Sequence, residues 1–179
     1  MEGSDGQEKR NKTVKKITTF PIPFPIEIFQ TSHSLNTNIS SKEQILEQAF
    51  KFHSSGNIKE AAKYYEYCIN QGINDYRIFT NYGIILHSLG NLKEAEIFFH
   101  KAIELNPDFA EAYFSLSSLQ YSNKNSIWKD QLFSENILNN KLQKEEVNIY
   151  FARANILHKE KNYEESSRYL KLANKLKLN

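Results

Sequence analysis

Cysteine is almost absent from the sequence, and long apolar runs are missing altogether. The single cysteine, Cys68, excludes an intramolecular disulfide and any metal cluster that needs several thiolates. No stretch approaches 18 consecutive apolar residues, and the polar start MEGSDGQEKRNKTVKK lacks the apolar core of a secretory signal. The net charge of +2 argues neither for nor against a nucleic-acid or membrane partner. From these absences we expect a cytoplasmic protein that does not bind a membrane.

Catalytic patterns are missing as well. There is no glycine-rich loop that could cradle a phosphate, and no serine or cysteine stands in the context of a catalytic triad. The paired glutamates at 145–146 and 164–165 are adjacent in sequence, so they do not face each other on a helix. Basic residues near the C-terminus, such as Arg168 and Lys175, are better explained as solvated surface than as a nucleic-acid site. The sequence predicts a protein that is not an enzyme, needs no cofactor and binds no nucleic acid.

Proline and glycine are scarce and unevenly placed. Three of the four prolines fall in FPIPFPIEIF at residues 20–29, where alternate prolines forbid a helix and favour an extended chain. Together with the polar residues around it, this segment forms a leader, residues 1–41, that we expect to be extended or disordered. Residues 108–179 contain neither glycine nor proline, which favours helices over that whole range.

One short sequence motif occurs twice. GNIKEAA at residues 56–62 returns as GNLKEAE at 90–96, an offset of 34 residues, and a fainter echo, KNYEESS, follows at 161–167. Apolar residues around the two copies recur at intervals of three and four, which predicts helices over 43–55, 59–71, 77–89 and 93–105. Gly90 would end one helix at a position suited to left-handed backbone geometry. The pattern predicts an all-α chain of paired helices.

The second of these pairs carries a family resemblance. The run NYGIILHSLGNLKEAEIFFHKAIELNP at residues 81–107 resembles a tetratricopeptide (TPR) repeat. The residues in the positions that mark the family are Phe79, Tyr82, Gly83, Leu86, Ala95, Phe99, Ala102 and Pro107. Gly83 and Ala95 would be small because the two helices cross there, with Phe99 filling the space beyond them. The preceding pair fits the same pattern.

The resemblance implies a right-handed superhelical solenoid of about four repeats, at residues 42–75, 76–109, 110–146 and 147–179. We expect the third repeat to be irregular, because it lacks a glycine at its turn and a small residue at its helix crossing, and has about three residues too many. Trp128 and Leu132 still offer an apolar face for a second helix. The fourth repeat recovers the pattern, with Ser166 in place of the usual alanine.

In TPR arrays the first helix of each pair lines an inner groove that binds a protein or peptide. Carried over position by position, the resemblance implies a groove that is apolar and aromatic at its middle and polar along one edge. The residues assigned to it are Leu46, Phe50, His53, Arg77, Thr80, Asn81, Ile84, His87, Phe114, Ser118, Tyr121, Phe151, Asn155 and His158. The implied function is a non-catalytic protein–protein interaction module.

The groove residues argue against one familiar TPR function. Chaperone-binding TPR domains clamp a terminal carboxylate of their ligand with lysine and arginine side chains. The corresponding positions hold Leu46, Phe50, Phe114 and Ser118, and only the asparagine of the clamp is retained, as Asn81. Without cations, burying a carboxylate would be costly. We therefore expect no carboxylate clamp.

Three histidines share one position of their repeats. His53, His87 and His158 could form a row along the groove and so raise the question of a metal site. Neighbouring repeats separate such residues by about 10 Å, whereas zinc ligands lie at about 2 Å from the ion. We expect no metal site.

A second resemblance spans nearly the whole chain. The leader and the closing segment YFARANILHKEKNYEESSRYLKLANKLKLN resemble segments of bacterial TPR–sulfotransferase proteins, in which a TPR array precedes a catalytic domain. The Pro-Arg-Ser-Gly-type loop that binds the sulfate donor in that domain is absent from the sequence. The resemblance implies an alternative function: the substrate-recruiting TPR half of a sulfotransferase, truncated or separately encoded, without its catalytic domain.

The last helix offers a further expectation about partners. The sequence ends directly after the fourth pair, without the extra polar helix that usually caps a repeat array. Leu170, Leu172, Ala173 and Leu176 lie at spacings of two to four residues, so they cannot all face one neighbouring helix. Apolar surface left exposed in this way marks a contact site. We expect the chain to self-associate, or to need a partner, through residues 163–179.

Overall fold

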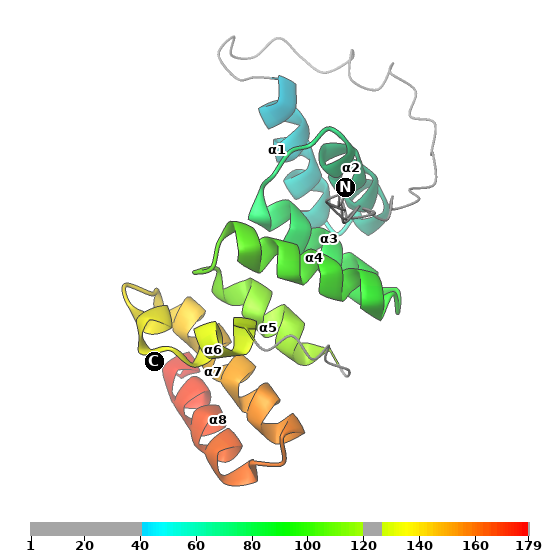
Figure 1. The fold of residues 1–179 in the computed structure, drawn as a ribbon. Coiled ribbons are helices and arrows are strands. Elements are labelled where there is room, and N and C mark those ends of the chain that lie inside the picture. Colours follow the sequence, from blue (N-terminus) through cyan, green and yellow to red (C-terminus); the bar gives the residue numbers. More distant parts are fainter. Residues whose placement is uncertain (1–40, 120–126, 179) are drawn as a thin grey trace, which may run out of the picture. The chain divides into compact units, whose positions relative to one another are not determined.

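The computed structural model describes residues 41–119 and 127–178 (Figure 1). Its regular elements in these ranges are α1 (Ser41–Ser54), α2 (Ile58–Asn70), α3 (Tyr76–Ser88), α4 (Leu92–Leu105), α5 (Ala110–Ser118), α6 (Ile127–Phe133), the 3-10 helix η2 (Glu135–Leu138), α7 (Gln143–Lys159) and α8 (Tyr163–Lys177). The all-α prediction is confirmed. The predicted leader lies, except for its last residue, outside the described residues. None of the described helices is both long enough and apolar enough to cross a membrane.

Consecutive helices form pairs, as the sequence repeat predicts. α1 packs against α2, α3 against α4, and α7 against α8. The turns inside the first two pairs place Gly56 and Gly90 at φ values of 77° and 81°, where a side chain would be strained. The matching turn of the last pair places Lys161 at φ 63°. The three turns therefore share one backbone geometry, and the fainter sequence echo at 161–167 marks the same structural feature.

The α3–α4 pair has a tight helix crossing. A Cβ atom added to Gly83 would lie 2.6 Å from Cε1 of Phe99, which is closer than real Cβ contacts allow. Ala95 and Phe99 are both completely buried. The small residues predicted at this crossing are thus required by the packing, and the group that Gly83 meets is the Phe99 ring.

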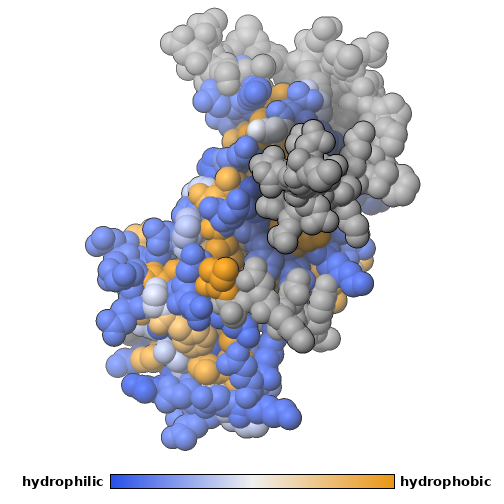
Figure 2. Space-filling view, in the orientation of Figure 1, coloured by the Kyte–Doolittle hydropathy of each residue, from blue (hydrophilic) through white to orange (hydrophobic). Residues whose placement is uncertain are grey.

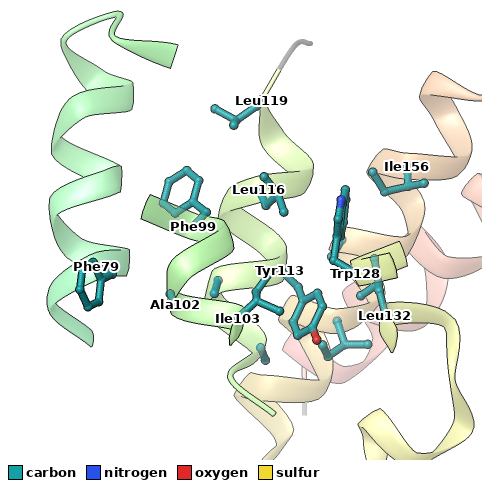
Figure 3. Packing of buried hydrophobic residues seen from close by; sticks show 14 of the residues in the cluster. Phe79, Phe99, Ala102, Ile103, Tyr113, Leu116, Leu119, Trp128, Leu132 and Ile156 are labelled. Carbon is teal, nitrogen blue, oxygen red and sulfur yellow. The ribbon is translucent and has the colours of Figure 1, made fainter. Parts of the chain in front are cut away.

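The buried residues of the array form two clusters. One lies between the first pair and α3 and includes Ala61, Tyr65, Cys68 and Ile78. The other extends from α3 to α7, and Figure 3 shows part of it. Burial raises the pKa of Cys68 to about 11, so its thiol stays protonated and packs as a small apolar group.

The third repeat departs from the helix pairing of the others, as the sequence predicts. Its second helix, α6, is short, and α5 packs extensively against α7 instead. Trp128 and Leu132 of α6 fill the space between α5 and α7, where Trp128 lies close to Ile156 (Figure 3). The apolar face of α5 is therefore covered partly by α6 and partly by the first helix of the next repeat.

Two cations of α7 satisfy backbone groups of this irregular region. The buried side chain of Arg153 donates hydrogen bonds to the carbonyl oxygens of Leu132 and Ser134, each at 2.9 Å. Lys159 donates from Nζ to the carbonyl oxygens of Ser117 and Leu119, at the end of α5. Because a short helix leaves carbonyl groups without intrahelical donors, these side chains replace the missing backbone bonds.

The outer surface of α8 has mixed character. Ala173 is buried, whereas Leu170 and Leu172 are each 39% exposed. Leu170 matches Tyr65 and Phe99 of the earlier repeats, which are completely buried. The expectation that the apolar residues of α8 cannot all face inward is confirmed for these leucines.

Candidate functional site

The predicted groove residues lie on α1, α3, α5 and α7, the first helix of each pair, except for Tyr121, which falls outside the described residues. On the face drawn in Figure 2, hydrophobic residues form a broken band bordered by hydrophilic ones. The assignment of Thr80 to the groove needs correction. Thr80 is 0% exposed, and its Oγ1 donates a hydrogen bond to the carbonyl oxygen of Tyr76 at 3.0 Å. Its side chain supports α3 from inside and is not available to a partner.

The first group of site residues surrounds the hydroxyl of Tyr65. Asn81 donates to this hydroxyl from Nδ2 at 3.2 Å, and Nδ1 of His53 lies 2.9 Å from it. Burial lowers the pKa of His53, with the charge of Glu111 acting in the opposite direction. A neutral imidazole can accept at Nδ1, so the Tyr65 hydroxyl donates to His53 while it accepts from Asn81. This network fixes the side chains of His53 and Asn81 within the predicted groove.

Arg77 is held by its own chain. Its guanidinium forms a two-point contact with the Asp75 carboxylate, at 3.0 Å from Nε to Oδ1 and 2.5 Å from Nη2 to Oδ2. Burial favours a raised pKa for Asp75, but hydrogen bonds from Arg77 bring it below its usual value. The Arg77 guanidinium also lies 5.0 Å from the centre of the Phe50 ring. Its charge is thus paired with a carboxylate of its own chain at the surface of the array.

The second group is aromatic and lies on α5 and α7. The rings of Phe114 and Phe151 are 6.2 Å apart and inclined at 53°, and both side chains are half-buried. Nζ of Lys177, on α8, lies 5.3 Å from the centre of the Phe151 ring. Asn155 donates from Nδ2 to Oγ of Ser117 at 3.1 Å and so ties α7 to α5 beside the rings. The geometry offers a partner two apolar ring faces next to a cation.

The remaining predicted residues contribute less to either group. Leu46 and Ile84 pack against the two buried clusters and are only partly exposed. The Ser118 hydroxyl donates to the carbonyl oxygen of Ser115, and the His158 ring lies 5.3 Å from that of Tyr163. His87 is partly exposed. Within residues 41–119 and 127–178, no group of three or more histidine, cysteine, aspartate or glutamate side chains could hold a metal ion.

Two residues that contact the predicted groove residues are not predicted from the sequence. Tyr65 and Lys177 lie on α2 and α8, the second helices of their pairs, whereas the family resemblance assigns the groove to first helices. For Tyr65 a signal was present, because it occupies the position of Phe99 but carries a hydroxyl that a buried site must satisfy. For Lys177 there was none, because its approach to Phe151 depends on how α8 packs on α7.

Two stretches of the chain match a known repeat family. A tetratricopeptide repeat family model matches residues 76–109 and 147–179. A solved structure, described as "TPR2B-domain:pHsp70-complex of yeast Sti1", is 18% identical to the chain, with 71% of this chain and 96% of that chain covered and a TM-score of 0.42. No curated protein matches the chain. The resemblance to sulfotransferase-linked arrays therefore stays a prediction. The second and fourth helix pairs of this chain are thus the parts that match the tetratricopeptide repeat model.

Proposed function

We propose that the chain is a non-catalytic interaction module that binds a protein or peptide on its inner face, the surface formed by α1, α3, α5 and α7. The observation that carries the proposal is the pair Phe114 and Phe151. The two rings are half-buried and in contact, and they lie on α5 and α7, two first helices that pack directly against each other. Aromatic side chains in this situation supply contact area at a low cost in conformational entropy, and they dominate binding surfaces.

The polar side of the inner face supports a ligand other than a terminal carboxylate. Asn81 donates one amide hydrogen to Tyr65, and the charge of Arg77 is paired with that of Asp75, so this side of the face offers no cation without a counter-charge for a carboxylate clamp. A partner carboxylate placed there would lose its water without gaining a compensating charge. The arrangement favours a partner that presents apolar side chains along an extended stretch.

A binding experiment with matched variants tests this proposal. Partners captured from a peptide library by the wild-type chain are measured against Phe114→Ala and against Ile97→Ala. Ile97 is 57% exposed on α4, outside the inner face, so its variant controls for loss of an exposed apolar side chain. We expect Phe114→Ala to weaken binding and Ile97→Ala to leave it unchanged, with the helical circular dichroism signal of both intact. Equal binding by all three proteins would contradict the proposal.

The same face would serve in the alternative function, recruitment of substrates to a sulfotransferase. That function also needs a catalytic domain with a Pro-Arg-Ser-Gly-type loop after a strand. A reading frame of this kind directly downstream of the final codon would favour the alternative over a free-standing module.

Exposed leucines on α8 support the further proposal that the chain self-associates. Leu172→Glu would place a charge in any contact through this helix and so lower the apparent mass in light scattering across a concentration series. A chain that is monomeric at every concentration, with or without the substitution, would contradict self-association through α8.

A further inference from the structure

We infer that Phe114, Phe151 and Lys177 bind an extended peptide segment in which an acidic side chain lies next to an apolar or aromatic one. The inference rests on the proposed function and adds the chemistry of the partner. The acidic group is the side chain of an aspartate or glutamate within the segment and is distinct from the terminal carboxylate of a peptide.

The irregular third repeat creates the aromatic part of this site. Because α6 is short, α7 packs directly on α5, and the contacts pair Phe114 with Phe151 and Ser117 with Asn155. Residue numbers rise together along the two helices, so they run parallel. Lys159 then holds the end of α5 through the Ser117 carbonyl oxygen, at 2.6 Å. The two rings are therefore fixed beside each other by polar contacts on the same helices.

Lys177 supplies the charge that selects an acidic partner. Its side chain is exposed, and its ammonium stands over the Phe151 ring. Among the described residues, no carboxylate lies within ion-pair distance of it. The other cation stacked on an inner-face ring, Arg77 over Phe50, is neutralised by Asp75. Of these two cation–ring pairs, only Lys177 over Phe151 has a positive charge that is not already paired with a carboxylate of the described residues.

The part of the inner face beside His53 has the opposite electrostatic character. Glu111, one turn before Phe114 on α5, is close enough to His53 for its negative charge to act on that ring. With Arg77 compensated, an acidic side chain placed there would meet Glu111 without a free cation. An acidic side chain at Lys177 would instead gain a charge-assisted contact, while its apolar neighbour packs on the rings. Charge complementarity thus sets where along the face the acid binds.

Three labelled peptides test the inference. They are octapeptides of the sequence Gly-Ser-Leu-Glu-Phe-Glu-Gly-Ser, and its forms with both glutamates replaced by glutamine or by lysine. All are amidated, which removes the terminal carboxylate. Fluorescence anisotropy should give the order glutamate, glutamine, lysine from tightest to weakest, with about two- to fivefold between neighbours, as measured exposed ion pairs suggest. The preference should shrink as salt is added.

Matched variants assign the preference to its residues. Lys177→Glu should reverse the order of the three peptides. Lys175→Glu makes the same change of charge two residues away on the same helix, where the side chain is also exposed, and should preserve the order. Phe114→Ala should weaken all three peptides without changing their order.

The outcomes separate this inference from the proposed function. If Phe114→Ala weakens binding but the three peptides bind equally to the wild type and to Lys177→Glu, the inference is overturned and the interaction module stands. If no peptide of the series binds, the inference is also overturned, whereas the library capture with Phe114→Ala and Ile97→Ala still decides the proposed function. If Lys175→Glu reverses the order as Lys177→Glu does, net charge explains the preference and the site is wrong.

Discussion

The second and third repeats bury similar apolar faces by different means. In the second, small residues on α3 and α4 let the helices approach until the Phe99 ring lies against Gly83. In the third, α5 has no full-length partner within its own repeat, and its face is covered by Trp128, Leu132 and the neighbouring α7. The difference shows that apolar burial can be supplied from the next repeat when a helix is shortened.

Backbone polar groups of the third repeat also need replacement partners. The shortened helices of the third repeat leave carbonyl groups that the regular ladder no longer satisfies, and side chains of α7 supply the donors. Arg153 also stacks on Phe133 and Tyr169, with its guanidinium carbon 5.7 Å and 5.4 Å from the two ring centres. The second repeat depends on shape, whereas the third depends on a few polar contacts.

The largest effect is expected from removing the ring that fills the regular crossing. Phe99→Ala should lower the free energy of unfolding by about 3–5 kcal/mol, because removing a fully buried aromatic side chain leaves a cavity. Phe133→Ala removes an aromatic ring from the third repeat that is 37% exposed, and should cost clearly less. Urea denaturation of both variants measures the comparison, and equal losses would show that the two repeats do not differ in this way.

A second test removes the polar anchor of the irregular repeat. Arg153→Leu keeps the apolar stem but leaves the carbonyl oxygens of Leu132 and Ser134 without these donors, at a cost of about 1–3 kcal/mol for each buried group. Hydrogen exchange should become faster in α6 and η2 than in α3 and α4. Arg168→Leu is the control, because Arg168 is exposed on α8 and should change stability little. Uniform exchange across all helices would rule out a local anchor.

Overpacking the regular crossing gives a third test. Ala95 is completely buried beside Phe99, so Ala95→Leu should lower the free energy of unfolding by about 1–3 kcal/mol. Ile97→Leu, on the exposed side of the same helix, changes apolar volume little and should have no measurable effect. An unchanged melting temperature for Ala95→Leu would count against the repeat register itself.

The contrast between the repeats also explains which parts of the fold could be predicted. The helix predicted at 77–89 is observed at Tyr76–Ser88, and that at 93–105 at Leu92–Leu105. These bounds were predictable because Gly90 and the apolar period mark them locally. The packing of α5 on α7 has no such local mark, because it depends on contacts such as Ser117 with Asn155, 38 residues apart. Lys177 was missed for the same reason, and Thr80 was misassigned because a repeat position does not reveal burial.

The smallest expected effect is a pH dependence of stability that comes from two histidines. His53 lies in the first repeat, and His100 lies at the junction of the second and third. Burial lowers the pKa of His53, against the charge of Glu111, and burial lowers that of His100, against its contact with Glu96. The unfolded chain should bind protons at an ordinary histidine pKa near 6.5.

Because the unfolded state then takes up more protons than the folded one, stability is complete above about pH 6.5 and declines as pH falls below that value. His53→Gln and His100→Gln should each reduce the decline. His100 lies against the Trp128 ring, with centres 6.3 Å apart, so its protonation should loosen α6, whereas that of His53 should disturb the Tyr65 network. Urea denaturation between pH 5 and 8 measures the slopes, with His158→Gln as an exposed control. Slopes that neither substitution changes would assign the pH dependence to other groups.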